Sequence, residues 1–452
     1  MAQHIQIDTT LAAKPNKAIE TTNRPMLFKL SKYAGGDVPK LVQAVITVTY
    51  TLDGSNFITE EVGKPLIQGR DWDSATTNPV FTVNVAPVIS SFVYSDLPLY
   101  KTIIATSGHS DPIKATDLGL VVSYSVAFTD WYNLAGVLTH NTGNIQTSDT
   151  FYAFSGYLKD DVILSDNISN CHATNTSLLK APWVINTALA GASVSEMSFL
   201  TNCPSSLVRD IPLGSPLVLG ALINQVSGLD VAIDYIDSNS AVITGLEITS
   251  NAFSTAATKD IHFSNLSINN DGLFGVTTNA LDYTIKSPKF SAYLNHNSST
   301  AGRKLNFNIV ERGANSVNGL FGTVHNDSTL IYFINDLNVL DFYLFNGFSN
   351  ISHENQISSY STSSKDYTNR SFSNNRVSRA STTEVVTCST IVNEEASVWL
   401  SEIFRSRAVF VYENNAFIPI SVIDGDTTPL SSDRIPTEFE LSFIKNTHQI
   451  NY

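Results

Sequence analysis

Apolar and polar residues alternate with a period of two along several stretches of the first third of the chain. The first stretch covers residues 44–52 and ends at an Asp-Gly pair, and the others cover residues 81–85 and 118–128. This alternation with an Asp-Gly turn is typical of antiparallel strands that have one buried and one solvent-facing side. We therefore expect residues 1–140 to form an antiparallel β domain, built as a sandwich or an open barrel.

The alternation weakens in the middle of the chain and returns in the last third. Residues 141–285 contain short apolar runs separated by Ser, Asn, Asp and Gly clusters, which indicate a second β-rich domain and leave open whether it is inserted into the first. Alternation resumes at Leu305 and recurs up to a final stretch at 438–443, so we expect a third β domain over residues 286–452. No segment repeats at a fixed period, which speaks against a solenoid or a propeller.

In one segment of the last domain, the spacing of the apolar residues changes from a period of two to a period of about 3.6, which is typical of a helix. Five apolar residues recur at this spacing: Ala396, Trp399, Leu400, Ile403 and Phe404. Asn393 stands at the capping position, and two glutamates follow it at the positive end of the helix dipole. We predict an amphipathic helix over residues 393–406 that packs on the C-terminal sheet. Trp399 and Phe404 are expected to be buried there, with Phe439 and Phe443 as neighbours.

A polar tract interrupts the last domain at residues 349–381. It is rich in Ser, Asn and Thr, and its basic residues outnumber its acidic ones. So little apolar surface cannot offset the entropy of ordering the tract. Two interpretations remain open: a mobile surface loop, or an extended arm that becomes ordered against a neighbouring acidic subunit. In the second interpretation the residues expected at the subunit interface are Lys365, Tyr367, Arg370, Phe372, Arg376 and Arg379.

Charge and composition narrow the classes of partner. The chain has a net charge of −14, and only 15% of its residues are charged. Such an acidic protein is poorly suited to bind nucleic acid directly. No apolar run is long enough for a membrane span, and the first residues, MAQHIQIDTT, lack the basic and apolar parts of a secretion signal. We expect a soluble protein made in a cytoplasm.

Candidate chemistry is sparse along the chain. The sequence has no GxSxG, no HExxH, no phosphate-binding loop and no dinucleotide-binding fingerprint. The three cysteines have no CxxC spacing, and whether Cys171 and Cys203 pair stays open. Aspartates at 71, 73, 424 and 426 lack the rest of a calcium loop and are interpreted as turn residues. We therefore expect no enzyme, no catalytic residue, no cofactor and no metal, although carboxylates from distant strands keep a polysaccharide depolymerase open.

The last quarter of the chain resembles structural proteins of tailed bacteriophages that infect Bacteroidetes, including the crAss-like group. The resemblance lies in the order LIYFINDLNVLDFYLFNG, a polar tract, a helix in NEEASVWLSEIFRS, VFVYENNAFIPISVID and EFELSFIKN. The matching positions are Tyr332, Phe333, Asn335, Trp399, Leu400, Ser406, Pro419, Val422, Phe439 and Phe443. Arg407 departs from the pattern, where a proline commonly follows the serine.

The resemblance implies a non-enzymatic structural subunit of a phage virion, assembled as an oligomeric ring in the tail or neck. Its partners would be copies of itself and neighbouring virion subunits. The alternative is a glycan-binding adhesin or receptor-binding β protein, because aromatic residues make up 10% of the chain. Most of these aromatic residues fall on the apolar phase of predicted strands, which favours core packing over a sugar-binding surface.

Overall fold

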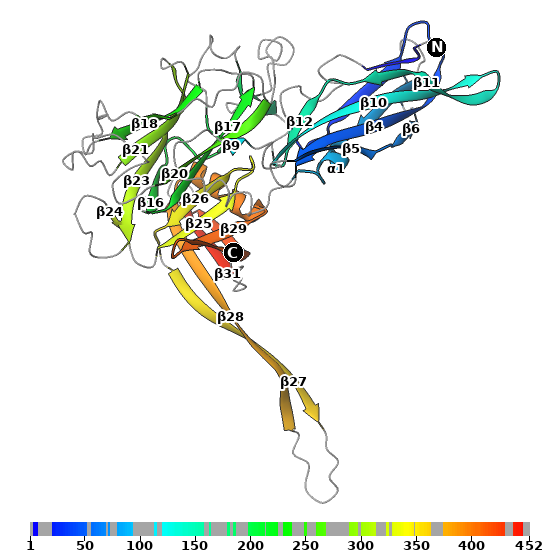
Figure 1. The fold of residues 1–452 in the computed structure, drawn as a ribbon. Helices are drawn as coiled ribbons and strands as arrows, with labels where there is room; N and C mark the ends of the chain where they lie inside the picture. Colours follow the sequence, from blue (N-terminus) through cyan, green and yellow to red (C-terminus); the bar gives the residue numbers. More distant parts are fainter. Residues whose placement is uncertain are drawn as a thin grey trace, which may run out of the picture. The chain divides into compact units, whose positions relative to one another are not determined.

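The computed structural model separates into two compact units, and strands dominate both (Figure 1). Unit 1 comprises residues 1–206, 214–307 and 335–340, and unit 2 comprises residues 207–213, 308–334 and 341–452. Within these units the structure describes residues 3–7, 20–51, 56–68, 71–72, 79–93, 113–114, 120–157, 162–163, 179–180, 184–186, 198–212, 214–224, 229–236, 248–250, 259–267, 289–296, 300–312, 322–324, 328–347, 349–362, 374–429 and 437–445.

Two sheets of unit 1 enclose one core. The first sheet has the order β1-β3-β8-β7, with β1 at Ile5–Ile7, β3 at Leu27–Lys32, β8 at Pro79–Asn84 and β7 at Asp71–Trp72. The second has the order β2-β12-β10-β4-β5, with β2 at Glu20–Thr21, β12 at Phe151–Phe154, β10 at Val121–Leu134, β4 at Pro39–Thr51 and β5 at Phe57–Gly63. Strand β11 (Val137–Thr147) also pairs with β10, and β6 (Leu66–Gln68) pairs with β4. The result is a β-sandwich, one of the two predicted forms, and it is antiparallel except at the pair β2–β12.

The period-two pattern explains how this sandwich forms its core. In β4, Ala44, Ile46 and Val48 are fully buried, and in β10 Val126 and Phe128 are buried in the same cluster. β3 supplies Phe28 from the first sheet, and its ring lies 5.5 Å from that of Phe128. One apolar face per sheet thus meets the other, as alternation predicts. The short helix α1 (Ala86–Ile89), which the alternation does not predict, adds Ala86 and Ile89 to the core.

Unit 1 also contains strands from the middle of the chain. One sheet has the order β15-β17-β20-β9, with β15 at Val184–Asn186, β17 at Pro216–Asn224, β20 at Lys259–Ser267 and β9 at Ile113–Lys114. Strands β21 (Lys289–His296), β18 (Leu229–Ile236) and β19 (Ile248–Ser250) pair in a second sheet, with β22 (Thr300–Ala301) beside β21. β13 (Val162–Ile163) and β14 (Leu179–Lys180) form a parallel pair. In unit 2, β16 (Val208–Pro212) and β24 (Gly322–Val324) both pair with β23 (Leu305–Arg312), most of which belongs to that unit.

Unit 2 is organised by one seven-stranded sheet. Its order is β26-β25-β29-β30-β31-β28-β27, with β26 at Leu340–Phe345, β25 at Thr329–Ile334, β29 at Val409–Glu413, β30 at Ala416–Pro429, β31 at Thr437–Lys445, β28 at Asn374–Val392 and β27 at Ser349–Thr362. The turn between β29 and β30 places Asn414 and Asn415 at φ values of 51° and 60°. Asparagine tolerates this left-handed region, so the pair closes a tight hairpin.

The amphipathic helix predicted over 393–406 is present in unit 2. Helix α4 spans Glu394–Leu400, and a 3-10 turn, η4, continues it over Ser401–Arg405. The Asn393 side chain accepts a hydrogen bond from the Ala396 N–H at 2.8 Å, which is the predicted N-cap. Trp399, Phe439 and Phe443 are all buried, as predicted.

Burial of Phe404 was predicted wrongly, because its side chain is 39% exposed. The ring still stacks on Phe439, with centroids 5.6 Å apart. The chain tightens from an α-helix to a 3-10 turn at Ser401, which changes the angular position of each later residue and rotates Phe404 toward the edge of the stripe.

The strand pairings also bear on the predicted segment boundaries. Residue 140, the predicted end of the first domain, falls inside β11. The next strand, β12, pairs with β10 in the same sheet, so the first sandwich extends to Phe154. Residues 241–248, one of the short apolar runs of the middle segment, lie outside the described residues except for Ile248, which begins β19.

Candidate assembly site

The last two strands at one edge of the unit 2 sheet, β28 and β27, continue beyond it as a two-stranded ribbon. β27 and β28 pair from Ser349 opposite Cys388 to Thr362 opposite Asn374. β31 accompanies β28 only over residues 385–392. Among the described residues, 353–362 and 374–384 therefore pair only with each other, and these two segments are called the ribbon below. Figure 1 shows the ribbon running away from its sheet.

The ribbon is long and has open backbone edges. At about 3.3 Å per residue, its paired part extends about 30 Å. Each strand of a two-stranded ribbon directs half of its N–H and C=O groups to an outer edge, where another strand or a side chain can bind them. A ribbon of this length has no core of its own, so its stability depends on the sheet at its base and on whatever contacts it.

A bulge in β28 determines which residues share a face of the ribbon. Ser358 lies opposite Arg379 and Ser359 lies opposite Val377, so Ser378 is an extra residue. In a regular strand Arg376 and Arg379, three positions apart, would lie on opposite faces. The extra residue reverses this parity, so both arginines share one face.

We call this surface the arginine face. It is defined by two neighbouring register pairs, Ser358 with Arg379 and Tyr360 with Arg376. The sequence predicted both arginines as interface residues, but the bulge that brings them to one face has no signal in the residue pattern. The other four predicted interface residues, Lys365, Tyr367, Arg370 and Phe372, lie in 363–373, outside the described residues.

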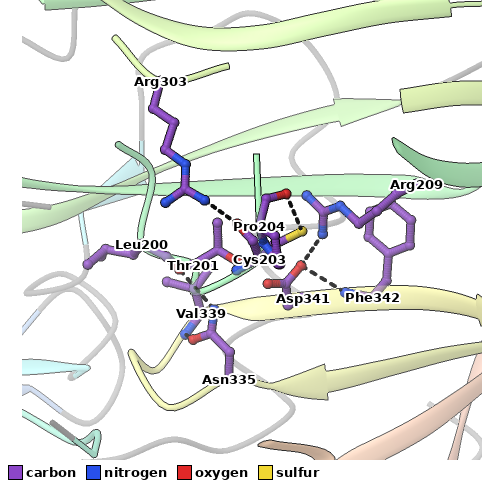
Figure 2. Close-up of polar contacts among 10 residues, drawn as sticks. All are labelled: Leu200, Thr201, Cys203, Pro204, Arg209, Arg303, Asn335, Val339, Asp341 and Phe342. Carbon is purple, nitrogen blue, oxygen red and sulfur yellow. Dashed lines mark hydrogen bonds and ion pairs between the residues drawn. The ribbon is translucent and has the colours of Figure 1, made fainter. Parts of the chain in front are cut away.

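A buried ion pair fixes the other end of the unit 2 sheet. The Arg209 guanidinium donates a hydrogen bond to the Asp341 carboxylate, and both side chains are buried (Figure 2). The guanidinium carbon lies 4.8 Å from the ring centroid of Phe342 and 5.5 Å from that of Trp399. The positive charge of Arg209 is therefore compensated by a carboxylate and two aromatic faces. The role of this ion pair is to stabilise the packing of the core.

Asn335, one of the residues that carry the phage resemblance, also has a structural role. Its Oδ1 accepts hydrogen bonds from the N–H groups of Leu337 and Val339, each at 3.0 Å. Its Nδ2 donates to the Leu200 carbonyl oxygen at 2.8 Å (Figure 2). These bonds hold the turn of residues 335–339 to the segment around Leu200 in unit 1.

A loop of unit 1 close to this turn is held by backbone acceptors. Arg303 donates to the Cys203 carbonyl oxygen at 2.8 Å, and the Cys203 thiol donates to the Pro204 carbonyl oxygen at 3.7 Å (Figure 2). Cys171 lies outside the described residues, so its pairing with Cys203 stays open. In unit 2, burial raises the pKa of the Cys388 thiol, and nearby Glu440 raises it further. Cys388 is therefore held in its unreactive thiol form.

Among the described residues, a buried cluster in the sandwich comes closest to a catalytic pair. His4 Nδ1 lies 2.9 Å from Asp130 Oδ2, and Asn141 Nδ2 donates to Asp130 Oδ1 at 3.0 Å. All three side chains are buried. The cluster joins β10, β11 and the first residues of the chain, so it tethers strand β1 and satisfies polar groups that burial would otherwise leave costly.

The described residues contain no group of three or more His, Cys, Asp or Glu side chains placed to hold a metal ion. No helix among them is long and apolar enough to cross a membrane.

The hairpin of β10 and β11 exposes apolar side chains at its turn, which the sequence pattern did not lead us to predict. β10 and β11 are joined by a turn at Ala135 and Gly136, with φ values of 50° and 87°. Leu134 and Val137, which flank it, are 54% and 65% exposed. The run of Leu, Ala, Gly, Val and Leu at 134–138 was a visible signal, because apolar residues seldom gather at a hairpin turn.

Comparison with known proteins assigns the chain to no family. No protein-family model matches it, and no curated protein is similar enough to count as a relative.

Proposed function

We propose that this protein is a non-enzymatic structural subunit of a phage virion, which assembles as an oligomeric ring in the tail or neck. The observation that carries the proposal is the β27–β28 ribbon, whose outer edges are open along residues 353–362 and 374–384 among the described residues. An isolated globular protein gains little from such an element. An assembly subunit gains a means of reaching its neighbour.

The open edges of the ribbon are suited to pairing with other chains. Soluble proteins shorten, cover or charge their edge strands, because an open edge pairs with other chains. Addition of a strand to such an edge is a recurrent mode of protein recognition, with affinity from main-chain hydrogen bonds. A ribbon of about 30 Å presents two of these edges at once, which suits repeated contacts between copies in a closed ring.

The residues that carry the phage resemblance support the same proposal at the level of the fold. Tyr332 and Phe333 are buried in β25, Trp399 and Leu400 in α4, and Phe439 in β31. The order of elements in unit 2 follows the order on which the resemblance rests: strand, polar tract, helix, strand, closing strand. The shared positions are packing positions, so they support a common architecture and carry no catalytic chemistry.

The proposal is tested on particles and on purified protein. We expect mass spectrometry of intact phage particles to detect the chain in a fixed ratio to the other structural proteins. Negative-stain images of concentrated purified protein should show closed rings. Absence of the chain from particles, together with a monomeric mass at all concentrations, would contradict the proposal.

An enzymatic side reaction is tested separately. Purified protein should release no sugar from host capsular polysaccharide. Turnover that one carboxylate substitution abolishes would overturn the non-enzymatic part of the proposal.

A further inference from the structure

We infer that residues 446–452, which directly follow β31, add a third strand to the ribbon by pairing with the backbone edge of β28. The segment itself lies outside the described residues, whereas the open edge and the strand that it would continue are both described.

The edge of β28 that faces β31 is occupied over only part of its length. β31 pairs with β28 from Val392 opposite Thr437 to Val385 opposite Ile444, and β27 occupies the other edge. Residues 374–384 of β28 continue the first edge without a strand partner among the described residues (Figure 1). The backbone N–H and C=O groups of this edge can therefore bind a further strand.

The register of β31 directs the residues that follow it onto this open edge. β28 and β31 are antiparallel, so each step forward along β31 is a step back along β28. The pairing ends with Val385 opposite Ile444, and β31 itself continues to Lys445. In the same register, residue 446 comes opposite residue 383, and residue 452 comes opposite residue 377. At about 3.3 Å per residue, this stretch extends about 23 Å along the ribbon.

The residue types of the segment suit a strand. Its sequence, NTHQINY, contains Thr, Ile and Tyr, which favour strands, and it has no Pro or Gly to end one. It also contains no Asp, Glu, Lys or Arg, the residues that commonly protect an edge from pairing.

The chain's own segment is favoured over a segment of a second copy. It is continuous with a strand that is already paired, so its addition closes no loop and costs little entropy beyond the ordering of its own backbone. A segment of a second copy would also lose the free translation and rotation of that copy.

Coverage of this edge would leave the ribbon with one open edge among the described residues, the outer edge of β27. In an assembly of identical subunits, a single open edge permits one strand-pairing contact per ribbon and gives that contact a direction. This consequence for assembly rests on the proposed function, whereas the added strand itself does not.

Engineered cysteine pairs test the register. Thr382→Cys with Thr447→Cys places two thiols on register partners, so we expect an intramolecular disulfide on oxidation, which peptide mass spectrometry separates from bonds of the native cysteines. Thr382→Cys with His448→Cys is the matched control, because a shift of one residue places the second thiol on the opposite face. The register pair should link at least about tenfold faster than the control.

Two outcomes of this experiment would overturn the inference. Equal rates for the two cysteine pairs would show that the segment does not pair in this register. A disulfide that forms only between two copies would show that a segment of the second copy occupies the edge instead.

Hydrogen exchange tests the same edge without cysteines. Removal of residues 446–452 should raise the exchange rate of alternate N–H groups in 377–383 by at least about tenfold, while the N–H groups that bind β27 change little. Thr447→Pro with His448→Pro should act in the same way at unchanged chain length, because one of two adjacent N–H groups must point to β28. Thr447→Ala with His448→Ala keeps both N–H groups and should keep the protection.

Unchanged exchange in both the truncated and the proline variants would contradict the added strand. None of these results depends on whether the chain is present in phage particles, so the mass spectrometry of particles tests the proposed function independently.

Discussion

Trp399 is the largest fully buried side chain of unit 2 and links the helix to the sheet. Its ring centroid lies 5.8 Å from that of Phe333 and 6.0 Å from that of Tyr343. The Arg209 guanidinium lies over its face, with the guanidinium carbon 5.5 Å from the ring centroid. One side chain thus contacts strands β25 and β26 and the buried ion pair.

We predict that Trp399→Ala lowers the free energy of unfolding by about 3–5 kcal/mol, the usual range for removal of a buried large aromatic residue. Urea unfolding followed by circular dichroism measures this change. The neighbouring Val398 is 62% exposed and provides the control, because Val398→Ala should change the free energy of unfolding by less than about 0.5 kcal/mol. Equal effects of the two substitutions would show that the helix does not dock through Trp399.

Gly425 and Phe404 form a second pair whose roles can be separated. A Cβ atom at Gly425 would overlap the Phe404 ring, which stacks on Phe439. We predict that Gly425→Ala destabilises the parent by about 1–3 kcal/mol, because the ring must leave its position. In a Phe404→Ala background most of this loss should disappear, leaving a small cost from the Glu440 carbonyl oxygen at 3.1 Å. Additive losses in a double-mutant cycle would contradict the proposed contact.

At the scale of elements, the start of α4 depends on one capping residue. The Asn393 side chain satisfies the Ala396 N–H, and the exposed glutamates at 394 and 395 lie in the first turn. We predict that Asn393→Ala lowers the free energy of unfolding by about 1 kcal/mol, while Asn393→Asp is nearly neutral because aspartate also accepts this bond. Thermal melts of both variants measure the difference, and equal melting temperatures for alanine and parent would contradict it.

The pair of Arg209 and Asp341 connects two segments of unit 2 that are 132 residues apart in the sequence. We predict that Asp341→Asn destabilises the protein by about 3–5 kcal/mol, because it removes the negative charge of a buried ion pair and keeps the positive one. Arg209→Met with Asp341→Asn should cost clearly less, since both members of the pair are then neutral. Chemical unfolding of the single and double variants measures this, and a double variant that is no more stable than the single one would contradict a charge effect.

At the scale of the whole molecule, the ribbon should be dispensable for folding and necessary for assembly. Ser352 and Val385 are register partners at its base, so residues 353–384 can be replaced by an Asn-Gly turn that joins them. We predict that this variant keeps the melting temperature of the parent within about 3 °C and loses its discrete oligomers, because the ribbon strands pair only with each other among the described residues. A variant that still assembles would show that the ribbon is not the contact.

Limited proteolysis gives an independent reading of the ribbon region. The polar tract at 349–381 should be cut rapidly in the free subunit and slowly in the assembled particle, because contacts with a neighbour order it. Equal resistance in both states would mean that no neighbouring subunit covers the tract, and the arm hypothesis would fail.

Much of the β architecture followed from local patterns, because alternation and helical period record which side of each element is buried. The alternating residues of β4 and β10 predicted their buried faces, and Asn393 with its apolar stripe predicted α4. The ribbon escaped this reasoning, since residues 353–362 and 374–384 show no alternation of apolar and polar residues. The 3-10 turn that exposes Phe404 could not be predicted from the sequence either, because it changes the helical period without changing the residue types.

The sequence by itself therefore determined the mainly β class, the strands with one buried face, the Asn414-Asn415 turn and the capped helix, all of which depend on residues close together in the chain. Tertiary structure alone decided the pairing of Arg209 with Asp341, the tether of His4 to Asp130 and the common face of Arg376 and Arg379. The physical reason is that these features depend on which distant segments meet and in which register. A bulge of one residue changes the face of every side chain that follows it.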